Sequence, residues 1–582
     1  MKPQQITYDI CRHYLSDNID TLPADIYNKL TGFLRQRNID KLATCTTLLS
    51  PTLVGRDMWR TLMQVEAFFK KNVSFSDAER CRQSAMSSFN RGERICRITN
   101  RRLEFYYLHS DRLDPTMKLY LSRMRGFIND TLGPYHDFLE QLPKLVRVTS
   151  GATSTKSRRQ AVPFLRISKR PYASRRAAPY LTALGRYFGY GTVRVRRTAT
   201  NRVEFVPKNW KTDRTIACEP EGNMFLQLAF DRYAKRRLKR KGINLSSQFR
   251  NQILAKQGSV DGSYATVDLS MASDTLAFNC VASLFPQSWF RYLNDVRSYR
   301  SRGGVEIDYA KFSSMGNGCT FALETLVFAA ACRAVGSRSS VVYGDDIVIE
   351  TKLVPELMRV LRFLGFLPND SKTHLAGPFR ESCGANWFGG VDITPKYLRE
   401  IDRRKATLCH VVNSMLTITG PGLELWDYLL FLVRNYKLPL TPFSDQTTAG
   451  VFITEEAARS LKLLSSRDKY GVNRWVTKAK AYVPVSPRRS NRDSRSLFLW
   501  YLDTSVNEDR TILDDTALFE RRLRVKQTGV PFVRENVVRS RYTISSHRYR
   551  RKWVHWREPV AGAPVQLTCW TEQILASAQA DP

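Results

Sequence analysis

The sequence has no paired cysteines and no long hydrophobic run. Its eleven cysteines are scattered, and none belongs to a Cys-x-x-Cys pair, which argues against a zinc site or a disulfide framework and favours free thiols in a reducing cytoplasm. The longest apolar stretch, around residues 320–335, is interrupted by Glu324 and Arg333 and falls short of the length that spans a bilayer. The first residues, Met1 to Ile6, show no secretory pattern. We therefore expect a chain without a membrane span or a secretory route.

Acidic residues are also few. The 582 residues include 54 Asp and Glu against 91 Lys and Arg, and the formal net charge is +37. Because Lys and Arg bind nucleic acids largely by neutralising phosphates, this excess predicts a polyanionic partner. The length allows three or four domains of ordinary size, or one intertwined unit.

Two of the acidic residues stand side by side at a sharp corner. They belong to Val341-Val-Tyr-Gly-Asp-Asp-Ile-Val-Ile-Glu350, in which a Gly-Asp step joins two apolar runs. This pattern predicts a β-hairpin that holds Asp345 and Asp346 rigidly at the edge of a sheet. Neighbouring carboxylates repel each other, and a divalent cation relieves that repulsion. For Gly-Asp-Asp alone, a solvated acidic turn is the alternative.

A second acidic motif lies upstream. Alternating apolar residues lead into Asp268, which predicts a strand that ends at this carboxylate. Asp274 follows where we expect a helix to start, near Thr275. A strand cap for Asp268 and a helix N-cap for Asp274 are the structural alternatives, and Asp274 can combine capping with another role.

The two motifs make a metal site if the strand before Asp268 lies beside the hairpin. Asp268, Asp345 and Asp346 would then form a three-carboxylate cluster for two divalent ions about 3.5–4 Å apart, an arrangement suited to nucleotidyl transfer. Mg²⁺ fits because it is a hard ion that binds carboxylates together with substrate phosphates. Mn²⁺ or Ca²⁺ can substitute for it in binding.

A glycine-rich loop lies between the two acidic motifs. Residues 313–320 read Ser-Ser-Met-Gly-Asn-Gly-Cys-Thr, and apolar residues at helical spacing follow up to Ala330. Such a loop lets backbone and hydroxyl groups approach a sugar-phosphate closely, because glycine has no side chain. We expect Ser314, Gly316 and Asn317 to contact a nucleotide, and a plain helix start is the alternative.

Together these motifs resemble motifs A, B and C of viral RNA-directed RNA polymerases. Asp268-x5-Asp274 matches motif A, residues 314–320 match motif B, and Tyr-Gly-Asp-Asp at 343–346 matches motif C. The wording is most similar to the replicase catalytic (beta) subunit of the small RNA bacteriophages, the leviviruses. The resemblance is dense from about 205 to 400 and thinner outside this range.

Two further blocks resemble this family. Phe205-Val-Pro-Lys-Asn-Trp-Lys-Thr-Asp-Arg-Thr-Ile216 is similar to the basic fingers motif F, and residues 377–384 with 390–395 are similar to the segment after the palm. The loop departs from the general viral pattern by placing Met315 after the serine. Glu324 stands where many viral polymerases have an asparagine, so the resemblance leaves open which group of the loop recognises the ribose.

The resemblance implies RNA-templated RNA synthesis, as in viral genome replication and transcription. The RNA 3′-hydroxyl would attack the α-phosphate of a ribonucleoside triphosphate and release pyrophosphate, with Asp268, Asp345 and Asp346 holding two Mg²⁺ ions. Asp274 would hydrogen-bond a ribose hydroxyl, which is both donor and acceptor.

Basic residues would bind phosphates. We expect Lys208, Lys211 and Arg214 to neutralise the charge of the incoming triphosphate or of the template. Lys372 could protonate the pyrophosphate, since polymerases of this type place a basic residue near this position, and an ordinary surface lysine is the alternative. His374 beside it is expected to be structural.

The expected fold is α+β, a right-hand polymerase of fingers, palm and thumb with an antiparallel palm sheet and a largely helical remainder. Residues 1–150 would form an N-terminal helical extension and part of the fingers. Residues 151–260 would form the basic fingers, where basic residues mixed with aromatic ones suit a nucleic-acid channel. Residues 261–400 would be the palm with the catalytic motifs, and 401–582 the thumb with a basic C-terminal extension.

Two other functions are possible from the residues. A reverse transcriptase also uses a palm with an aspartate pair, but such enzymes usually carry a bulky aromatic residue soon after the first aspartate. Here residues 269–274 are mostly small and polar, and Gly344 also favours the RNA polymerase form. A basic RNA-binding protein without catalysis fits the charge, but not the three spaced acidic motifs.

The resemblance also implies partners and a location. Template and product RNA and ribonucleoside triphosphates are the expected substrates, without a membrane. Phage replicases of this type work with the host translation elongation factors Tu and Ts, often with a ribosomal RNA-binding protein. We therefore expect these partners in the cytoplasm of a bacterial host, bound to the N-terminal segment and the thumb.

Overall fold

All the site residues expected from the sequence lie in the part of the chain that the structure describes. This computed structural model describes residues 3–148, 151–155, 170–189, 192–302, 306–402, 404–444, 446–468, 475–484, 549–555 and 564–579. Part of the expected basic fingers (156–169) and most of the expected basic C-terminal extension (485–548) lie outside these ranges.

Three short strands form the palm sheet. β5 (Tyr264–Val267), β9 (Asp346–Glu350) and β8 (Val341–Tyr343) are antiparallel neighbours in that order, with β9 in the centre. Their apolar and β-branched residues are largely buried, which favours pairing across a tight turn. The predicted hairpin, the strand that ends at Asp268 and the antiparallel palm sheet are confirmed.

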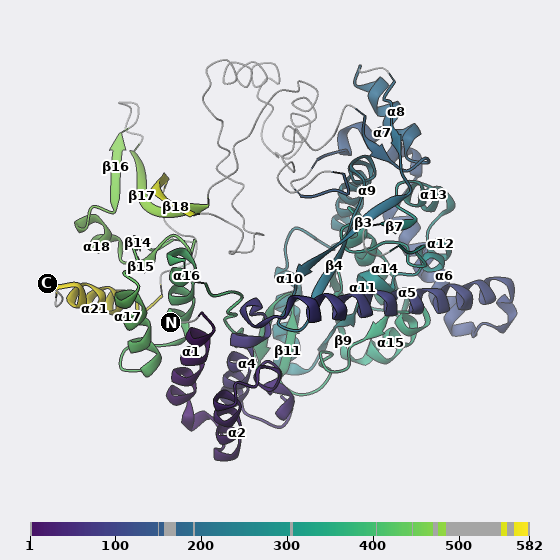
Figure 1. Cartoon of the computed structure of the whole chain (residues 1–582). Coiled ribbons are helices and arrows are strands. Elements are labelled where there is room, and N and C mark those ends of the chain that lie inside the picture. The colour runs from purple at the N-terminus through teal and green to yellow at the C-terminus, as the bar shows by residue number, and fades with distance from the viewer. Residues whose placement is uncertain are drawn as a thin grey trace.

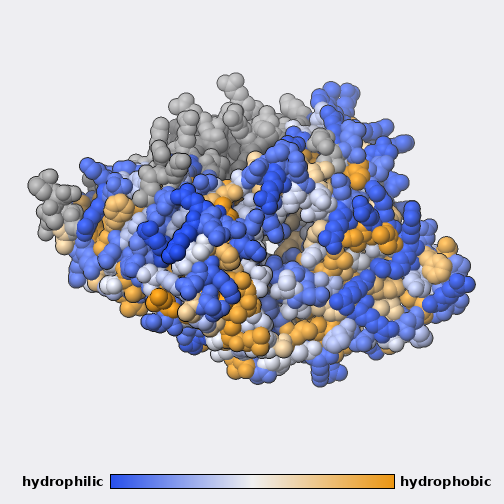
Figure 2. All heavy atoms as spheres, turned by 60° about the horizontal axis from the view of Figure 1, so that its bottom comes forward, coloured by the Kyte–Doolittle hydropathy of each residue, from blue (hydrophilic) through white to orange (hydrophobic). Residues whose placement is uncertain are grey.

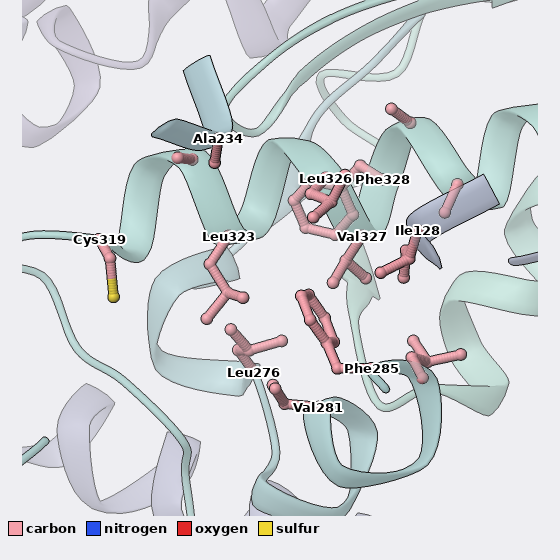
Figure 3. Packing of buried hydrophobic residues seen from close by; sticks show 14 of the residues in the cluster. Ile128, Ala234, Leu276, Val281, Phe285, Cys319, Leu323, Leu326, Val327 and Phe328 are labelled. Carbon is pink, nitrogen blue, oxygen red and sulfur yellow. The ribbon is translucent and has the colours of Figure 1, made fainter. Parts of the chain in front are cut away.

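A buried helix supports this sheet. α14 (Thr320–Ala334) is apolar around its circumference, and nearly all of its residues are buried, as expected for a helix that is hydrophobic on every side. It packs against α6 (Pro115–Leu132), α9 (Glu221–Arg240) and β8. Figure 3 shows part of this core, in which Val327 points toward Phe285.

The longest helix of the described residues runs across the front of the molecule in Figure 1. α5 (Ala78–Leu108) has 31 residues and extends to the far right in Figure 1. Its first turn is capped by Asp77, whose carboxylate accepts hydrogen bonds from two backbone N–H groups. Its inner face packs on α11 (Ala272–Thr275) and α12 (Phe278–Leu284). An N-terminal helix therefore packs against the segment that carries Asp274.

One helix boundary differs from the prediction. The helix expected to begin near Thr275 ends there instead, and the next one begins at Phe278. Met271, just before α11, adopts the left-handed backbone conformation with φ of 56°, which a non-glycine residue rarely does. The side chain of Asp274 caps neither helix, so the capping alternative for Asp274 is wrong.

A second sheet carries the basic segment. β4 (Asp213–Cys218), β3 (Thr200–Pro207) and β7 (Arg300–Arg302) pair in that order. β3 and β4 are antiparallel, and the turn between them contains Lys208 and Lys211. The turn therefore presents both lysines at one end of the sheet.

The first helices share a second hydrophobic core with distant segments. α1 (Pro3–Asp17) and α4 (Arg56–Lys70) pack with α16 (Lys405–Met415), α17 (Glu424–Asn435) and α21 (Leu567–Gln579). Figure 1 shows α1 beside α17 and α16, with α21 behind them at the left. This core combines the beginning of the described chain with its last third.

The surface is largely polar on the face that Figure 2 presents. Figure 2 shows that hydrophilic side chains cover much of the face it presents, with apolar patches between them. No helix within the described ranges combines the length and hydrophobicity needed to cross a bilayer.

The remaining elements of the described residues are mostly short. The other helices and strands are α2 (Ala24–Arg35), α3 (Ile39–Leu42), α7 (Tyr135–Leu145), α8 (Ala178–Tyr187), α10 (Phe249–Asp261), α13 (Gln287–Asp295), α15 (Val354–Phe363), α18 (Glu455–Ser460), β1 (Tyr172–Ala173), β2 (Arg196–Arg197), β6 (Leu269–Ser270), β10 (Leu367–Pro368), β11 (Phe379–Ser382), β12 (Ala385–Phe388), β13 (Val391–Asp392), β14 (Leu440–Pro442), β15 (Val451–Ile453), β16 (Leu464–Asp468), β17 (Trp475–Pro484) and β18 (Tyr549–His555).

Candidate active site

The register of the palm sheet brings three carboxylates to one edge. Val267, the last residue of β5, pairs with Ile347 of β9. Asp268, which follows β5, and Asp346, the first residue of β9, therefore lie at the same end of the sheet. Asp345 occupies the turn just before β9. The residues singled out by two separate motifs therefore lie together.

The turn itself is held by α14. Gly344 has a φ of 65°, and a Cβ there would come within 2.5 Å of the Phe321 ring. Its N–H donates to the hydroxyl of Thr325 at 3.0 Å. Glycine is required here both by the backbone conformation and by the aromatic ring, and the position of Asp345 follows from this packing.

Burial and mutual repulsion raise the pKa values of two of these acids. Asp345 reaches solvent, but the surrounding protein desolvates it enough to raise its pKa, and the charge of Asp268 raises it further. Burial and then the charge of Asp345 raise the pKa of Asp346 to about 6. The backbone N–H of Cys383 donates to Asp346 at 3.3 Å and offsets only part of this effect.

Asp268 has a basic neighbour. Its Oδ2 accepts a hydrogen bond from Asn369 at 2.9 Å and lies 3.6 Å from the ammonium of Lys372. Burial lowers the pKa of Lys372, but Asp268, Glu381 and Asp345 outweigh it and the net pKa is raised. The structure therefore places Lys372 at the acidic edge as a cation.

These carboxylates suit a hard divalent ion in their chemistry. All three offer oxygen ligands. Burial first, and then the charges of neighbouring carboxylates, raise the pKa values of Asp345 and Asp346, and a cation would relieve that charge. In the described part of the chain, no group of three or more His, Cys, Asp or Glu side chains is already arranged around a metal position. The side chain of Asp268 is engaged by Asn369 and Lys372 instead.

The basic residues of the β3–β4 hairpin differ in how strongly they interact with the acidic residues. Partial burial and the charges of Arg214 and Lys372 lower the pKa of Lys208, while Asp268 and Asp345 raise it. Arg214 in turn lowers the pKa of Asp345. Lys211 instead has its ammonium 5.1 Å from the Trp210 ring. Lys208 and Arg214 are thus electrostatically coupled to the acids, and Lys211 lies at the tip of the turn.

The glycine-rich loop is packed against β4 and α9. The N–H of Ala217 donates to the backbone oxygen of Met315 at 2.8 Å, and a Cβ at Gly316 would come within 2.5 Å of the Ala217 oxygen. Gly316 is therefore required by the approach of β4, whatever binds the loop. Ser314 and Asn317 are buried, and the Asn317 side chain accepts from the N–H of Cys319 at 3.0 Å.

Asp274 and Glu324 lie deeper in the palm. Oδ1 of Asp274 accepts from the ammonium of Lys311 at 2.8 Å. Glu324, on α14, is buried, and burial followed by the charge of Asp345 raises its pKa to about 8, an effect that Ser273 partly offsets. Its Oε1 has no hydrogen-bond partner. The charges of Asp345 and Asp274, one from each acidic motif, therefore both act on this carboxyl group of α14.

Sequence patterns missed Lys311 and assigned His374 to structure. Lys311 stands among aromatic residues, between Tyr309 and Phe312, and that unusual setting is its only sequence signal. His374 pairs with Thr266 through backbone hydrogen bonds of 3.0 and 3.3 Å. Burial and the charges of Arg380 and Lys372 lower its pKa to about 4, so it is a neutral residue that ties its segment to β5.

The site combines three carboxylates at one end of a sheet with basic side chains and a glycine-rich loop. This combination is typical of a polymerase that transfers nucleotides. Comparison with known proteins is more specific. A family model described as RNA replicase, beta-chain, matches residues 59–422. The chain belongs to this family of RNA-directed RNA polymerases.

Individual relatives agree with the family. The RNA-directed RNA polymerase subunit beta of Enterobacteria phage SP is 38% identical over 395 residues, which cover 64% of this chain and 68% of the relative. The subunit beta of Qbeta virus (strain MX1) is 35% identical over 503 residues, 83% of either chain. A solved BmCPV RNA-dependent RNA polymerase is 10% identical with a TM-score of 0.38, over 62% of this chain and 36% of that one, which is too distant to add to the assignment.

The family fixes the reaction. The chain synthesises RNA on an RNA template from ribonucleoside triphosphates, and its fold is the α+β right-hand polymerase expected from the motifs. Polymerases of this class depend on divalent metal ions. The reverse transcriptase and the non-catalytic RNA-binding protein are excluded as alternatives.

Proposed function

We propose that this chain joins nucleotides through two Mg²⁺ ions held by Asp268, Asp345 and Asp346. The observation that supports this assignment is the pairing of β5 with β9, which brings the three carboxylates to one edge. When bound, the ions would activate the RNA 3′-hydroxyl and neutralise the leaving pyrophosphate. Mn²⁺ or Ca²⁺ would substitute in binding. Asp268 would hold an ion with the same carboxylate that lies beside Lys372.

Basic residues bind the triphosphate in this scheme. Lys208 and Arg214 neutralise its phosphates, since both interact electrostatically with the acidic residues. Lys211 adds a third positive charge on the same hairpin. Lys372 lies 3.6 Å from Asp268 and keeps its proton. From this place it donates that proton to the pyrophosphate as it leaves.

A carboxylate and the glycine-rich loop recognise the sugar. Asp274 accepts a hydrogen bond from the ribose 2′-hydroxyl. The loop with Ser314, Gly316 and Asn317 orients the nucleotide through backbone groups, since the side chains of Ser314 and Asn317 are buried. Selection of ribonucleotides thus comes from a carboxylate and a rigid loop.

The domains follow the same division. Residues 1–150 are an N-terminal helical extension and part of the fingers, 151–260 the basic fingers, 261–400 the palm, and 401–582 the thumb with a basic C-terminal extension. Helices α5 and α6 of the first segment pack into the palm core, so this extension also supports the active site.

The chain works in the cytoplasm of a bacterial host together with host proteins. The relatives that support this proposal are phage proteins named as subunits. Translation elongation factors Tu and Ts are the proposed partners, with a ribosomal RNA-binding protein as a further one. They bind the N-terminal segment and the thumb.

One assay tests the proposed chemistry. The full-length chain, with and without bacterial extract, is incubated with an RNA template, Mg²⁺ and labelled ribonucleoside or deoxyribonucleoside triphosphates. Incorporation of ribonucleotides that stops on chelation and returns with Mg²⁺ supports the proposal. Synthesis that persists in the presence of excess chelator would contradict it.

A further inference from the structure

Lys311 is buried completely beneath the proposed ribose-binding residue. Its side chain has 0% exposure, and its ammonium nitrogen lies 2.8 Å from Oδ1 of Asp274, whose side chain is 20% exposed. A buried lysine is stable as a cation only where a carboxylate compensates its charge. Lys311 and Asp274 therefore hold each other in place, and of the two only Asp274 is partly exposed.

Glu93 closes this pair from α5. Its Oε1 lies 3.6 Å from the Lys311 ammonium, and its side chain is 1% exposed. Its Oε2 accepts a hydrogen bond from the N–H of Ala310 at 2.7 Å. Because the contact with Asp274 is 0.8 Å shorter than the contact with Glu93, Asp274 is the main partner of the lysine.

The surroundings leave Asp274 little freedom. The Phe89 ring centre lies 3.6 Å from the Lys311 ammonium and covers it from α5. A Cβ at Gly92 would come within 2.8 Å of the backbone oxygen of Asp274, and the thiol of Cys96 donates to that oxygen at 3.5 Å. Backbone and side chain of Asp274 are both fixed, and Oδ2 remains as an acceptor.

We propose that Lys311 is a positioning residue for ribose recognition. By binding Oδ1 it fixes the orientation of the Asp274 carboxylate and directs Oδ2 to the 2′-hydroxyl of the incoming ribonucleotide. The inference rests on the proposed function of Asp274. It also assigns a role in substrate choice to helix α5, which contributes Glu93 and contains no residue of the acidic motifs.

The test compares substrate choice in variants of the full-length chain. Lys311→Met keeps the length of the side chain and removes its charge. The ratio of kcat/KM for a ribonucleotide to that for its deoxyribonucleotide is measured. We expect Lys311→Met and Asp274→Ala each to lower this ratio by roughly tenfold, the effect of losing one charge-assisted hydrogen bond. The double variant should show no further loss, because both changes remove the same interaction.

A matched control separates positioning from stability. Phe89→Leu weakens the packing over Lys311 but keeps the ion pair, so it should lower the melting temperature without changing the ratio. Lys311→Gln, which retains a neutral donor, is the second variant should Lys311→Met not fold. It should lower the ratio by a smaller factor than Asp274→Ala does.

The outcomes distinguish the two claims. An unchanged ratio in Asp274→Ala overturns the proposed role of Asp274. A lowered ratio in Asp274→Ala with an unchanged ratio in the folded Lys311 variants overturns the role of Lys311 alone. Equal losses in Phe89→Leu and Lys311→Met would make the lysine a purely structural residue and would also overturn the inference.

Discussion

Glu324, inside α14, is electrostatically coupled to Asp345 at the hairpin turn. Burial, and then the negative charge of Asp345, raise the pKa of Glu324 to about 8. At neutral pH this carboxyl is therefore largely protonated, and it can donate a hydrogen bond where an ionised glutamate only accepts. A neutral residue with a donor also resembles the asparagine that many viral polymerases have at this place.

The first prediction concerns the protonation of Glu324. An unfolded chain loses this proton near the ordinary value of 4.5, and the folded protein keeps it up to about pH 8. Because the folded state then binds the extra proton, the wild type should lose stability relative to Glu324→Gln as pH rises through this interval, with no further loss above it. Urea unfolding of both proteins at several pH values, without divalent ions, measures the difference. A difference that stays constant with pH would contradict the raised pKa.

The second prediction concerns the metal ligands. Asp345→Asn and Asp268→Asn should lower nucleotide incorporation by roughly 10³-fold or more, as expected when a group that acts in the transition state is removed. RNA binding should remain nearly intact, because the positive charge that drives it lies elsewhere. Incorporation and filter binding are measured on the same preparations. Near wild-type synthesis by Asp345→Asn would refute the two-metal assignment.

The third prediction separates the three basic residues of the β3–β4 hairpin. Lys208→Ala and Arg214→Ala should raise the KM for ribonucleotides by roughly tenfold, the effect of losing one charge-assisted phosphate contact. Lys211→Ala should have a smaller effect, because its ammonium lies against Trp210. Steady-state kinetics at fixed template concentration provides the values. A loss of template affinity alone would place these residues on the template path.

The fourth prediction concerns the hairpin turn. Gly344→Ala introduces a Cβ 2.5 Å from the Phe321 ring at a φ of 65°, and it should destabilise the protein by about 1–3 kcal/mol and abolish synthesis. Gly384→Ala is the matched control, because its φ is 76° but no atom lies within 4 Å of the added Cβ. Urea unfolding should show the smaller loss for the control. Equal losses of unfolding free energy in both variants would show that the contact with Phe321 does not contribute to the destabilisation.

The fifth prediction concerns host proteins. The chain should copurify with elongation factors Tu and Ts from a bacterial host, and high-salt removal of these proteins should abolish sustained synthesis. Mass spectrometry of the purified complex and add-back of the factors test both parts. Full, sustained activity of the isolated chain after stringent purification would refute the proposal.

The acidic motifs could be predicted from the sequence because each depends on local pattern. The apolar runs around Gly344 predict the hairpin, and the alternation before Asp268 predicts its strand. The helix boundary near Thr275 could not be predicted in the same way. It depends on the left-handed conformation of Met271, which no residue preference favours.

Local sequence patterns could not predict the contacts between distant segments. Glu93 and Lys311 are separated by more than two hundred residues, and neither belongs to a recognisable motif. Gly316, in contrast, could be assigned to a nucleotide-binding motif from the sequence. The approach of Ala217, which requires a glycine there, became clear only in three dimensions.

The core shared by α1, α4, α16, α17 and α21 has a consequence for synthesis of the protein itself. A ribosome makes α1 and α4 before their partners, and their apolar faces can be covered only after residues 405–435 and 567–579 have emerged. The early helices must therefore wait in an incompletely buried state during most of translation, when they are prone to aggregation. Folding of this core therefore depends on residues as far along the chain as α21.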